Sequence, residues 1–224
     1  MTIHLAGDST VASGKPDEAP LSGWGGCLGR FVSVPVVNHA VGGATTESFI
    51  AEGRWAALLG GVEPGDRVLI QFGHNDQKEP LLDARGAFRD RLNGFVDDVR
   101  DRAAEPILLT SVERRLFEGK RLRPSHGPYP QTVRDLAQER QLGLIDLTVF
   151  TTWLYEWLGP DDSRSLFVHV EPGEHAAWPK GNADDTHFRT EGATAIAAYV
   201  AQALAALDGL GADQPALGQW GVRP

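Results

Sequence analysis

Short runs of branched apolar residues alternate with longer amphipathic segments along this chain. Such runs are typical of buried strands, and apolar residues that recur at spacings of three and four are typical of helices. Strands that alternate with helices predict an α/β fold with a parallel sheet. The predicted strands are Ile3–Ala6, Pro35–Val41, Arg67–Phe72, Pro106–Val112 and Leu142–Leu147. The predicted helices are residues 84–105, residues 129–143 with Gly143 as C-terminal cap, and residues 190–207 with Thr190 as N-terminal cap.

Length and charge narrow the class of protein further. The 224 residues suit a single domain over residues 1–224, without internal repeats. Acidic residues outnumber basic ones by 30 to 21, and the formal charge of −9 argues against a nucleic-acid or anionic-membrane partner. No apolar run is long enough to cross a bilayer, and residues 1–10 do not resemble a secretory signal. A cytoplasmic protein is therefore expected, unless a leader has been removed.

The residues that could carry chemistry follow the predicted strands. In an open parallel sheet, ligands bind beyond the carboxyl ends of the strands, and long loops in a compact domain tend to be functional. Ser9 follows the first strand, Gly42 and Gly43 follow the second, and Asn75 follows the third. Taken alone, each is explained better by a turn or a helix cap than by a functional role. The long loops predicted here are residues 8–26, 114–129 and 159–185.

A late segment, ADDTHF, supplies partners for Ser9. A serine hydroxyl is a weak nucleophile, so Ser9 needs a base, and His187 can accept its proton near neutral pH. Asp184 can fold back to hold the imidazole, with Asp185 as its rival for that role. These residue types together predict an acyl-transfer site.

Such a site also needs donors for the oxyanion that develops on the substrate. The N–H groups of Ser9 and Gly43 and the side-chain amide of Asn75 can provide them, and a glycine lets the substrate approach the backbone closely. The nucleophile elbow Gly-x-Ser-x-Gly is absent, because Val11 stands in its last position. A serine hydrolase of another class is therefore predicted.

Four short blocks of the sequence resemble those of the GDSL or SGNH hydrolases. They are GDST at Gly7–Thr10, NHAVGG ending at Gly43, GHND at Gly73–Asp76 and DDTH at Asp184–His187. The resemblance implies a flavodoxin-like three-layer sandwich with a central parallel five-stranded sheet, and a serine esterase without metal or cofactor. It implies Ser9 as nucleophile, Asp184 and His187 as triad acid and base, and Ser9, Gly43 and Asn75 as oxyanion donors.

Within that group, the sequence looks most like the rhamnogalacturonan acetylesterase branch. The likeness rests on GDSTVA, GWG, IQFGHND and DDTHF, together with LTSVERRLFEGKRL, HGPYP, LIDLT and LYEWLGP. It implies removal of O-acetyl groups from a plant cell-wall saccharide. Where relatives often read GGRSSRSF this chain reads GGATTESF, so Ala44 and Glu47 replace arginines suited to pairing with carboxylates. With the acidic net charge, this change favours a neutral or short acetylated sugar.

Two other functions fit the same residues less well. A general short-chain carboxylesterase, or an acylhydrolase of thioesters or lysophospholipids, would use the same site, but the chain has no long apolar lid segment for a long acyl chain. A non-catalytic carbohydrate-binding domain would not need Ser9, Gly43, Asn75, Asp184 and His187 together. The sequence thus favours an acetylated oligosaccharide or another small ester as substrate, and it indicates no oligomeric state.

Several further residues have a structural explanation beside a functional one. Trp24 and Trp178 are candidate sugar contacts, against packing in the core or in a loop, and His74 is expected to support the site or position the substrate. Cys27 is the only cysteine, which excludes an internal disulfide and favours a buried, unreactive thiol. The basic run 114–123 predicts a solvated hairpin or loop. In HVEPGEH, Pro172 and Gly173 argue against a metal site formed by His169, Glu171, Glu174 and His175.

Overall fold

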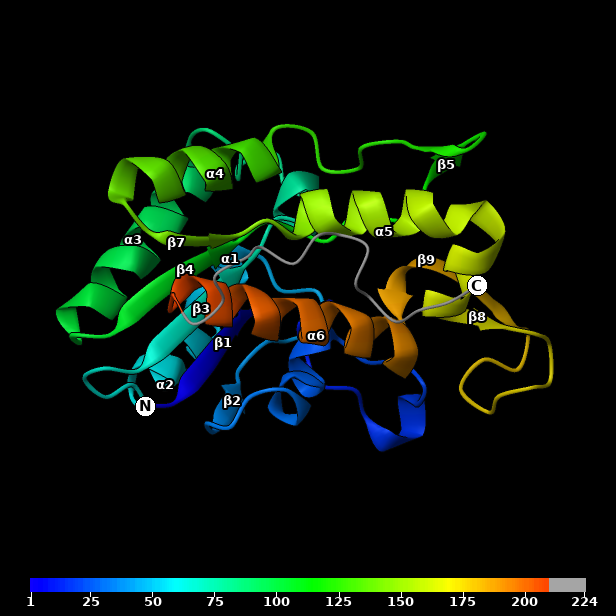
Figure 1. Ribbon diagram of the computed structural model, residues 1–224, viewed down its shortest axis with the longest axis horizontal. Coiled ribbons are helices and arrows are strands. Elements are labelled where there is room, and N and C mark those ends of the chain that lie inside the picture. The colour runs from blue at the N-terminus through cyan, green and yellow to red at the C-terminus, as the bar shows by residue number, and fades with distance from the viewer. Residues whose placement is uncertain (210–224) are drawn as a thin grey trace.

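The structure, a computed structural model, describes residues 1–209 of the chain. At its centre five strands form one sheet in the order β2-β1-β3-β4-β7 (Figure 1). Every neighbouring pair in this sheet is parallel. The strands are β1 Ile3–Gly7, β2 Val36–Asn38, β3 Arg67–Gln71, β4 Glu105–Leu109 and β7 Gly143–Ile145. Each overlaps a predicted strand, and the predicted parallel five-stranded sheet is confirmed.

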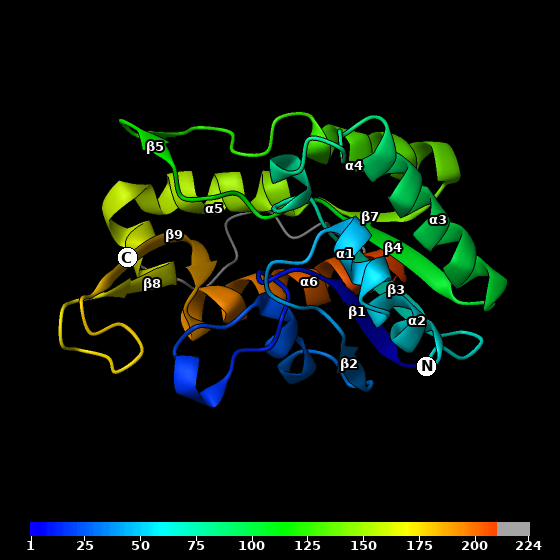
Figure 2. The ribbon, with the colours of Figure 1, turned by 180° about the vertical axis from the view of Figure 1, so that it is seen from behind.

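Helices cover both faces of the sheet and complete three layers. They are α1 Thr46–Ala51, α2 Arg54–Leu59, α3 Ala87–Asp101, α4 Tyr129–Arg140, α5 Leu147–Asp162 and α6 Thr190–Leu207. On one face α5 and α6 pack over Leu5 and Leu69, and on the other α1 to α4 pack over Ala6 and Val68. Figures 1 and 2 show these two layers from opposite sides. Because successive side chains of a strand point to opposite faces, strands covered on both sides read as continuous apolar runs.

Two predicted helix caps are wrong. The cap of α4 is Gln141, with a φ of 51°, whereas Gly143 already belongs to β7. Arg189, not Thr190, is the cap residue of α6. The Thr190 hydroxyl instead donates to the Pro20 carbonyl at 3.2 Å. The periodicity located both helices, but tertiary contacts decide the residue at which each begins or ends.

The loop predicted over residues 159–185 contains regular structure. Helix α5 continues past a kink at Gly159, whose φ is 75°, into Pro160 and beyond. Two strands follow, β8 (Phe167–Val170) and β9 (Asn182–Phe188), which pair antiparallel outside the central sheet. A glycine and a proline in succession suggested a loop, yet here they only bend the helix. Strand β9 contains Asp184 and His187, two of the three predicted triad residues.

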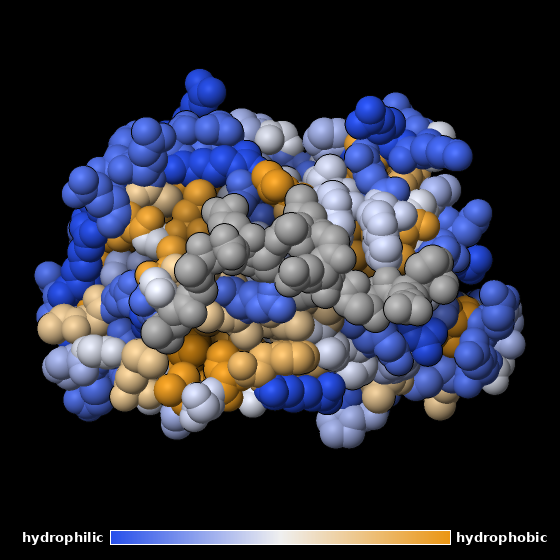
Figure 3. All heavy atoms as spheres, viewed as in Figure 1, coloured by the Kyte–Doolittle hydropathy of each residue, from blue (hydrophilic) through white to orange (hydrophobic). Residues whose placement is uncertain are grey.

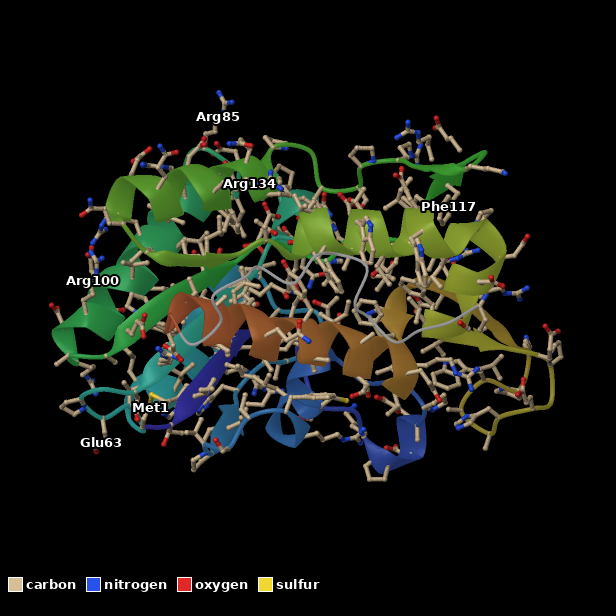
Figure 4. All side chains as sticks on the ribbon, in the orientation of Figure 1. Met1, Glu63, Arg85, Arg100, Phe117 and Arg134 are labelled. Carbon is tan, nitrogen blue, oxygen red and sulfur yellow. The ribbon has the colours of Figure 1, made fainter. Side chains whose placement is uncertain are left out.

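The other long loops contain short elements. The basic run 114–123 contains a hairpin, one of the two forms predicted, in which β5 (Phe117–Glu118) pairs with β6 (Arg121–Leu122). The run is not solvated throughout, because the Arg115 side chain is only 13 % exposed and pairs with Asp185. Figure 4 shows Phe117 at the end of the molecule opposite Met1. Single turns of 3-10 helix occur at Pro16–Glu18, Trp24–Gly26, Leu28–Arg30, Asp76–Lys78 and Ser163–Leu166.

The surface is mixed in character. Figure 3 shows hydrophilic residues around the rim of the face seen in Figure 1, with smaller apolar areas between them. Within residues 1–209, no helix has the length and hydropathy needed to span a membrane.

Cys27 is buried and forms no disulfide, in agreement with the prediction of a buried thiol.

Substitution by alanine should have opposite effects on stability at Gly192 and at Gly94. A Cβ on Gly192, in the first turn of α6, would lie 3.0 Å from the Leu166 carbonyl carbon and closer still to its oxygen. Gly192→Ala should therefore destabilise the fold by about 1–3 kcal/mol through overpacking. Gly94, within α3, has open space around it. Gly94→Ala should stabilise by roughly 0.5–1 kcal/mol through helix propensity. Urea denaturation of both variants measures the two effects, and a stabilised Gly192→Ala variant would contradict this packing.

Candidate active site

Ser9 stands on a tight turn directly after β1. The carbonyl of Asp8 accepts the N–H groups of Val11 and Ala12 at 3.1 and 2.9 Å, which closes the turn. The Asp8 side chain is buried, and its Oδ1 accepts both the N–H and the hydroxyl of Thr10 at 2.9 Å. Ser9 lies between these two buried residues and is itself only half-buried. Asp8 thus holds the turn that presents the Ser9 hydroxyl.

A chain of buried hydrogen bonds supports this turn from below. The Trp24 indole N–H donates to Gln71 Oε1 at 2.8 Å, and Gln71 Nε2 donates to the Thr10 hydroxyl at 2.6 Å. Trp24 is completely buried (0 % exposed), so the suggested contact with a sugar is wrong. Its indole ring packs in the core, because its N–H finds a partner on β3. Trp24 therefore supports the nucleophile turn instead of contacting the substrate.

His187, on β9, reaches Ser9 from outside the central sheet. Its Nε2 is 3.0 Å from Ser9 Oγ, and its Nδ1 is 2.7 Å from Asp184 Oδ2. Asp184 Oδ1 also accepts the backbone N–H groups of Thr186 and His187, at 2.8 and 2.9 Å. Burial raises the pKa of the Asp184 carboxyl, but these hydrogen bonds outweigh it and hold the pKa below its ordinary value. A carboxylate at Nδ1 leaves Nε2 free to accept the Ser9 proton.

The adjacent carboxylate, Asp185, is used to anchor β9. Arg115 Nη1 and His169 Nε2 contact its Oδ1 at 2.7 and 2.9 Å. The Arg115 N–H also donates to the Asp185 carbonyl at 2.8 Å. Neighbouring side chains of a strand point to opposite sides, so anchoring Asp185 turns Asp184 the other way. The structure thus brings Asp184, and not its rival, against His187.

The glycine loop after β2 passes close to the nucleophile. A Cβ on Gly42 would lie only 3.8 Å from Ser9 Cβ. Gly43 has a φ of 79°, which favours glycine, and no atom outside Gly42–Ala44 lies within 4 Å of the position a Cβ would take. Asn75 Nδ2 donates to the carbonyl of Ala44 at 3.1 Å, which ties the amide to the same loop. The structure therefore gathers Ser9, the two glycines and Asn75 at the carboxyl ends of the first three strands.

Two neighbours of Asn75 hold this segment in place. Lys78 Nζ donates to Asn75 Oδ1 at 2.9 Å, which orients the amide so that its nitrogen faces the loop. Asp76 is buried, and its two oxygens accept the N–H of Gly73 at 3.0 Å and the N–H and hydroxyl of Thr46 at 2.8 and 2.6 Å. Asp76 thus joins the loop after β3 to the first turn of α1.

His74 does not face the site, so the prediction of direct substrate positioning is wrong for its side chain. It is 2 % exposed, and its Nε2 lies 2.8 Å from the carbonyl of Val112, which the His126 Nε2 contacts at the same distance. A carbonyl only accepts, so both imidazoles carry their proton on Nε2. Burial, with the nearby Arg114 cation, lowers the pKa of His74 to about 3. His74 is therefore a neutral, structural residue.

Trp178 lies in the turn between β8 and β9. Its ring is half-buried, with a ring centroid 4.8 Å from that of His175. It does not line the cavity at Ser9, and its contact with a sugar stays a prediction. In the part of the chain that the structure describes, no three His, Cys, Asp or Glu side chains are placed to hold a metal ion.

An open cavity of about 510 Å³ begins at Ser9 and His187. Its walls come from the loop after β1, from the segment 40–42 before α1, and from Arg54 on α2. In Figure 2 the chain from β2 to α1 runs past the end of β1. A small ester can therefore reach the Ser9 hydroxyl without displacing any part of the fold.

The residues that support the site were not predicted from the sequence. Gln71 and Thr10 lie beneath the nucleophile turn, and Arg115 and His169 anchor β9. One signal was available for Arg115, because it follows β4 and so stands at the carboxyl edge where ligands bind. A signal was also available for Gln71, because it is a polar residue at the carboxyl end of the otherwise apolar strand β3.

Comparison with known proteins places these features in a family. The family profile described as GDSL-like lipase/acylhydrolase matches residues 5–195. The rhamnogalacturonan acetylesterase RhgT of Bacillus subtilis is 44 % identical over 205 residues, which cover 90 % of this chain and 88 % of that protein.

Solved structures agree with this fold. The protein YxiM of Bacillus subtilis superposes with a TM-score of 0.80 at 26 % identity, over 92 % of this chain. The chain spans only 56 % of YxiM. An acetylxylan esterase of Geobacillus stearothermophilus superposes with a TM-score of 0.63 at 17 % identity, over 96 % of this chain and 97 % of that one. At that identity the likeness shows the fold alone.

The buried Asp8 predicts a dependence of stability on pH. Burial raises the pKa of its carboxyl above the ordinary 3.8, although the Thr10 hydrogen bonds oppose the shift. The folded state thus keeps this proton to a higher pH than the unfolded chain, and the stability it contributes is lost as the pH rises through the folded pKa. Asp8→Asn keeps the acceptor for Thr10 but cannot ionise. Its stability relative to wild type should therefore increase from about pH 4 to about pH 7.

Urea denaturation at several pH values measures this difference. The exposed Asp161→Asn controls for the loss of one carboxylate. Stability curves for wild type and Asp8→Asn that run parallel across this range would show that burial does not shift the Asp8 pKa.

Proposed function

The chain belongs to the GDSL-like lipase/acylhydrolase family and is a carboxylic ester hydrolase. From that premise we propose that it removes O-acetyl groups from a plant cell-wall type of saccharide through an acyl-enzyme on Ser9. The observation that carries this proposal is the pair of hydrogen bonds from Ser9 Oγ to His187 Nε2 and from His187 Nδ1 to Asp184, at 3.0 and 2.7 Å. Nucleophile, base and orienting carboxylate then stand in the order that acyl transfer requires.

The first half of the reaction acylates the serine. Ser9 Oγ attacks the acetyl carbonyl carbon while His187 Nε2 takes the hydroxyl proton. Asp184 stabilises the imidazolium and keeps the proton of the free imidazole on Nδ1. The tetrahedral intermediate collapses when the bond to the sugar oxygen breaks, and His187 returns its proton to that oxygen. The sugar leaves with a free hydroxyl, and the acetyl group stays on Ser9.

The second half releases acetate. A water molecule takes the place of the sugar, His187 accepts one of its protons, and the resulting hydroxide attacks the acetyl carbon. The bond to Ser9 Oγ then breaks, and His187 returns the proton to the serine. In both halves, the N–H groups of Ser9 and Gly43 and the Asn75 amide stabilise the negative charge on the carbonyl oxygen by donating hydrogen bonds to it. Removal of one such donor lowers kcat by about 10²–10³-fold.

The class of substrate is inferred from the relatives. The protein that is 44 % identical over most of both chains is named a rhamnogalacturonan acetylesterase. The open cavity of about 510 Å³ at Ser9 supports an ester carried on a bulky group such as an oligosaccharide. Acetyl is the acyl group named in this relative and in the acetylxylan esterase that shares the fold, which supports an acetyl ester as substrate.

Removing the nucleophile or the orienting carboxylate tests the mechanism. Ser9→Ala should lower kcat on p-nitrophenyl acetate by at least about 10³-fold, and Asp184→Asn by roughly 10⁴-fold, because the latter leaves the wrong imidazole tautomer. Asp135→Asn is the control, since it removes an exposed carboxylate from α4 and should leave kcat near that of wild type. Equal losses in the two aspartate variants would exclude the assigned role of Asp184.

The substrate class is tested with the wild-type protein. Acetate release from acetylated oligosaccharides, and hydrolysis of p-nitrophenyl acetate in preference to the octanoyl ester, are the expected results. Preference for octanoyl, with no acetate from saccharides, would favour a lipid acylhydrolase.

A further inference from the structure

A second cavity, of about 560 Å³, begins at Gly43. Gly42 lines the cavity at Ser9, whereas Gly43 lines this one, so the two neighbouring glycines stand between the two spaces. The walls of the second cavity include Glu47, Glu79 and Leu81, and the Leu81 side chain is 87 % exposed. A saccharide whose acetyl group reaches Ser9 can therefore extend past the glycines into this space.

The neutral polar groups of this cavity are already used within the chain. Ser48 N–H donates to the Thr45 hydroxyl, and Thr45 N–H to the Ser48 hydroxyl, both at 3.0 Å. These reciprocal hydrogen bonds form the capping box at the start of α1. The charged side chains are then the groups best placed to select a ligand.

An ion pair between two helices crosses the wall of this cavity. Arg91 on α3 places its Nε 2.6 Å and its Nη2 2.5 Å from the Glu47 Oε2 on α1. Glu79 adds a second carboxylate, so carboxylates outnumber the guanidinium here. A guanidinium that holds one carboxylate is a poor partner for another, and a neighbouring carboxylate repels an anion.

The cavity at Ser9 is lined by Lys15, Arg54 and Glu18. Both cations already pair with carboxylates, Lys15 with Glu18 and Arg54 with Glu52, each at 3.1 Å. The Gly43 side differs because its lining has two carboxylates and one cation, so an anionic sugar is disfavoured most on that side.

Building on the proposed function, we propose that the Gly43 cavity binds the sugar unit beside the acetylated one and that Glu47 determines specificity there. By occupying Arg91, Glu47 selects an uncharged sugar over a uronate. Leu81 offers an apolar surface to the C–H face of the sugar ring. Arg91 could pair with a uronate if Glu47 did not occupy it. Replacement of the Glu47 carboxylate alone should therefore change the specificity.

Glu47→Gln tests this assignment, because it keeps the size of the side chain and releases the guanidinium. The measurement is kcat/KM on acetylated oligogalacturonides, which carry a carboxylate on every sugar, divided by that on acetylated xylo-oligosaccharides. The substitution should raise this ratio roughly 1.5-fold to fivefold, which corresponds to the free energy of an exposed ion pair. The gain should shrink in about 0.5 M salt through screening, and adding Arg91→Gln should abolish it.

Glu139→Gln is the matched control, because Glu139 pairs with Arg89 of the same helix α3 in a different cavity. It removes the same charge and should leave the ratio unchanged. An equal change of the kcat/KM ratio in both variants, or an unchanged ratio in Glu47→Gln, would overturn the role of Glu47. Acetate release from the saccharides by wild type would still uphold the proposed function in that case. Wild type that hydrolyses p-nitrophenyl acetate but releases no acetate from either saccharide would overturn both.

Discussion

The hydrogen bond between Ser9 and His187 is the contact on which the rest of the site depends. It joins two residues 178 positions apart in the chain, one at the end of a strand in the central sheet and one on a strand pair outside it. A displacement of about 1 Å between such groups can cost about 10²-fold in rate. Both partners therefore need supports that do not move, and much of the polar interior serves that purpose.

Those supports are buried polar side chains, and Gln71 and Asp76 have hydrogen-bond partners for both polar atoms of the side chain, whereas Asp8 has one for Oδ1 only. Gln71 is 0 % exposed and is paired at both ends, with Trp24 and Thr10. Asp76 accepts three hydrogen bonds, one from Gly73 in the loop after β3 and two from Thr46 in the first turn of α1. A buried polar group without a partner costs about 1–3 kcal/mol, so these networks favour one arrangement of the loops over looser alternatives. The same rigidity that stabilises the fold thus positions the nucleophile and the proposed oxyanion donors.

The sheet and the site residues could be predicted from the sequence because both leave local signals. Buried parallel strands read as apolar runs, and chemistry-bearing residues follow them at the carboxyl edge. Strand β9 and helix α5 left weaker signals: β9 is polar and half-exposed, and a Gly-Pro pair interrupts α5. Trp24 could not be assigned, since a buried and a stacking tryptophan look alike in sequence. The position of Arg115 after β4 places it at the carboxyl edge, but its contact with Asp185, and that of His169, depend on tertiary placement.

Formation of an acetyl-enzyme on Ser9 is the step from which all the assigned roles follow. Its most direct measurement is mass spectrometry of the protein quenched in acid within milliseconds of mixing with p-nitrophenyl acetate, followed by peptide mapping. One acetyl group on the peptide that contains Ser9, and none on that peptide in Ser9→Ala, is the predicted result. Rapid turnover with the acetyl group on another residue, or with no acetylated peptide while a burst of p-nitrophenol is seen, would contradict it.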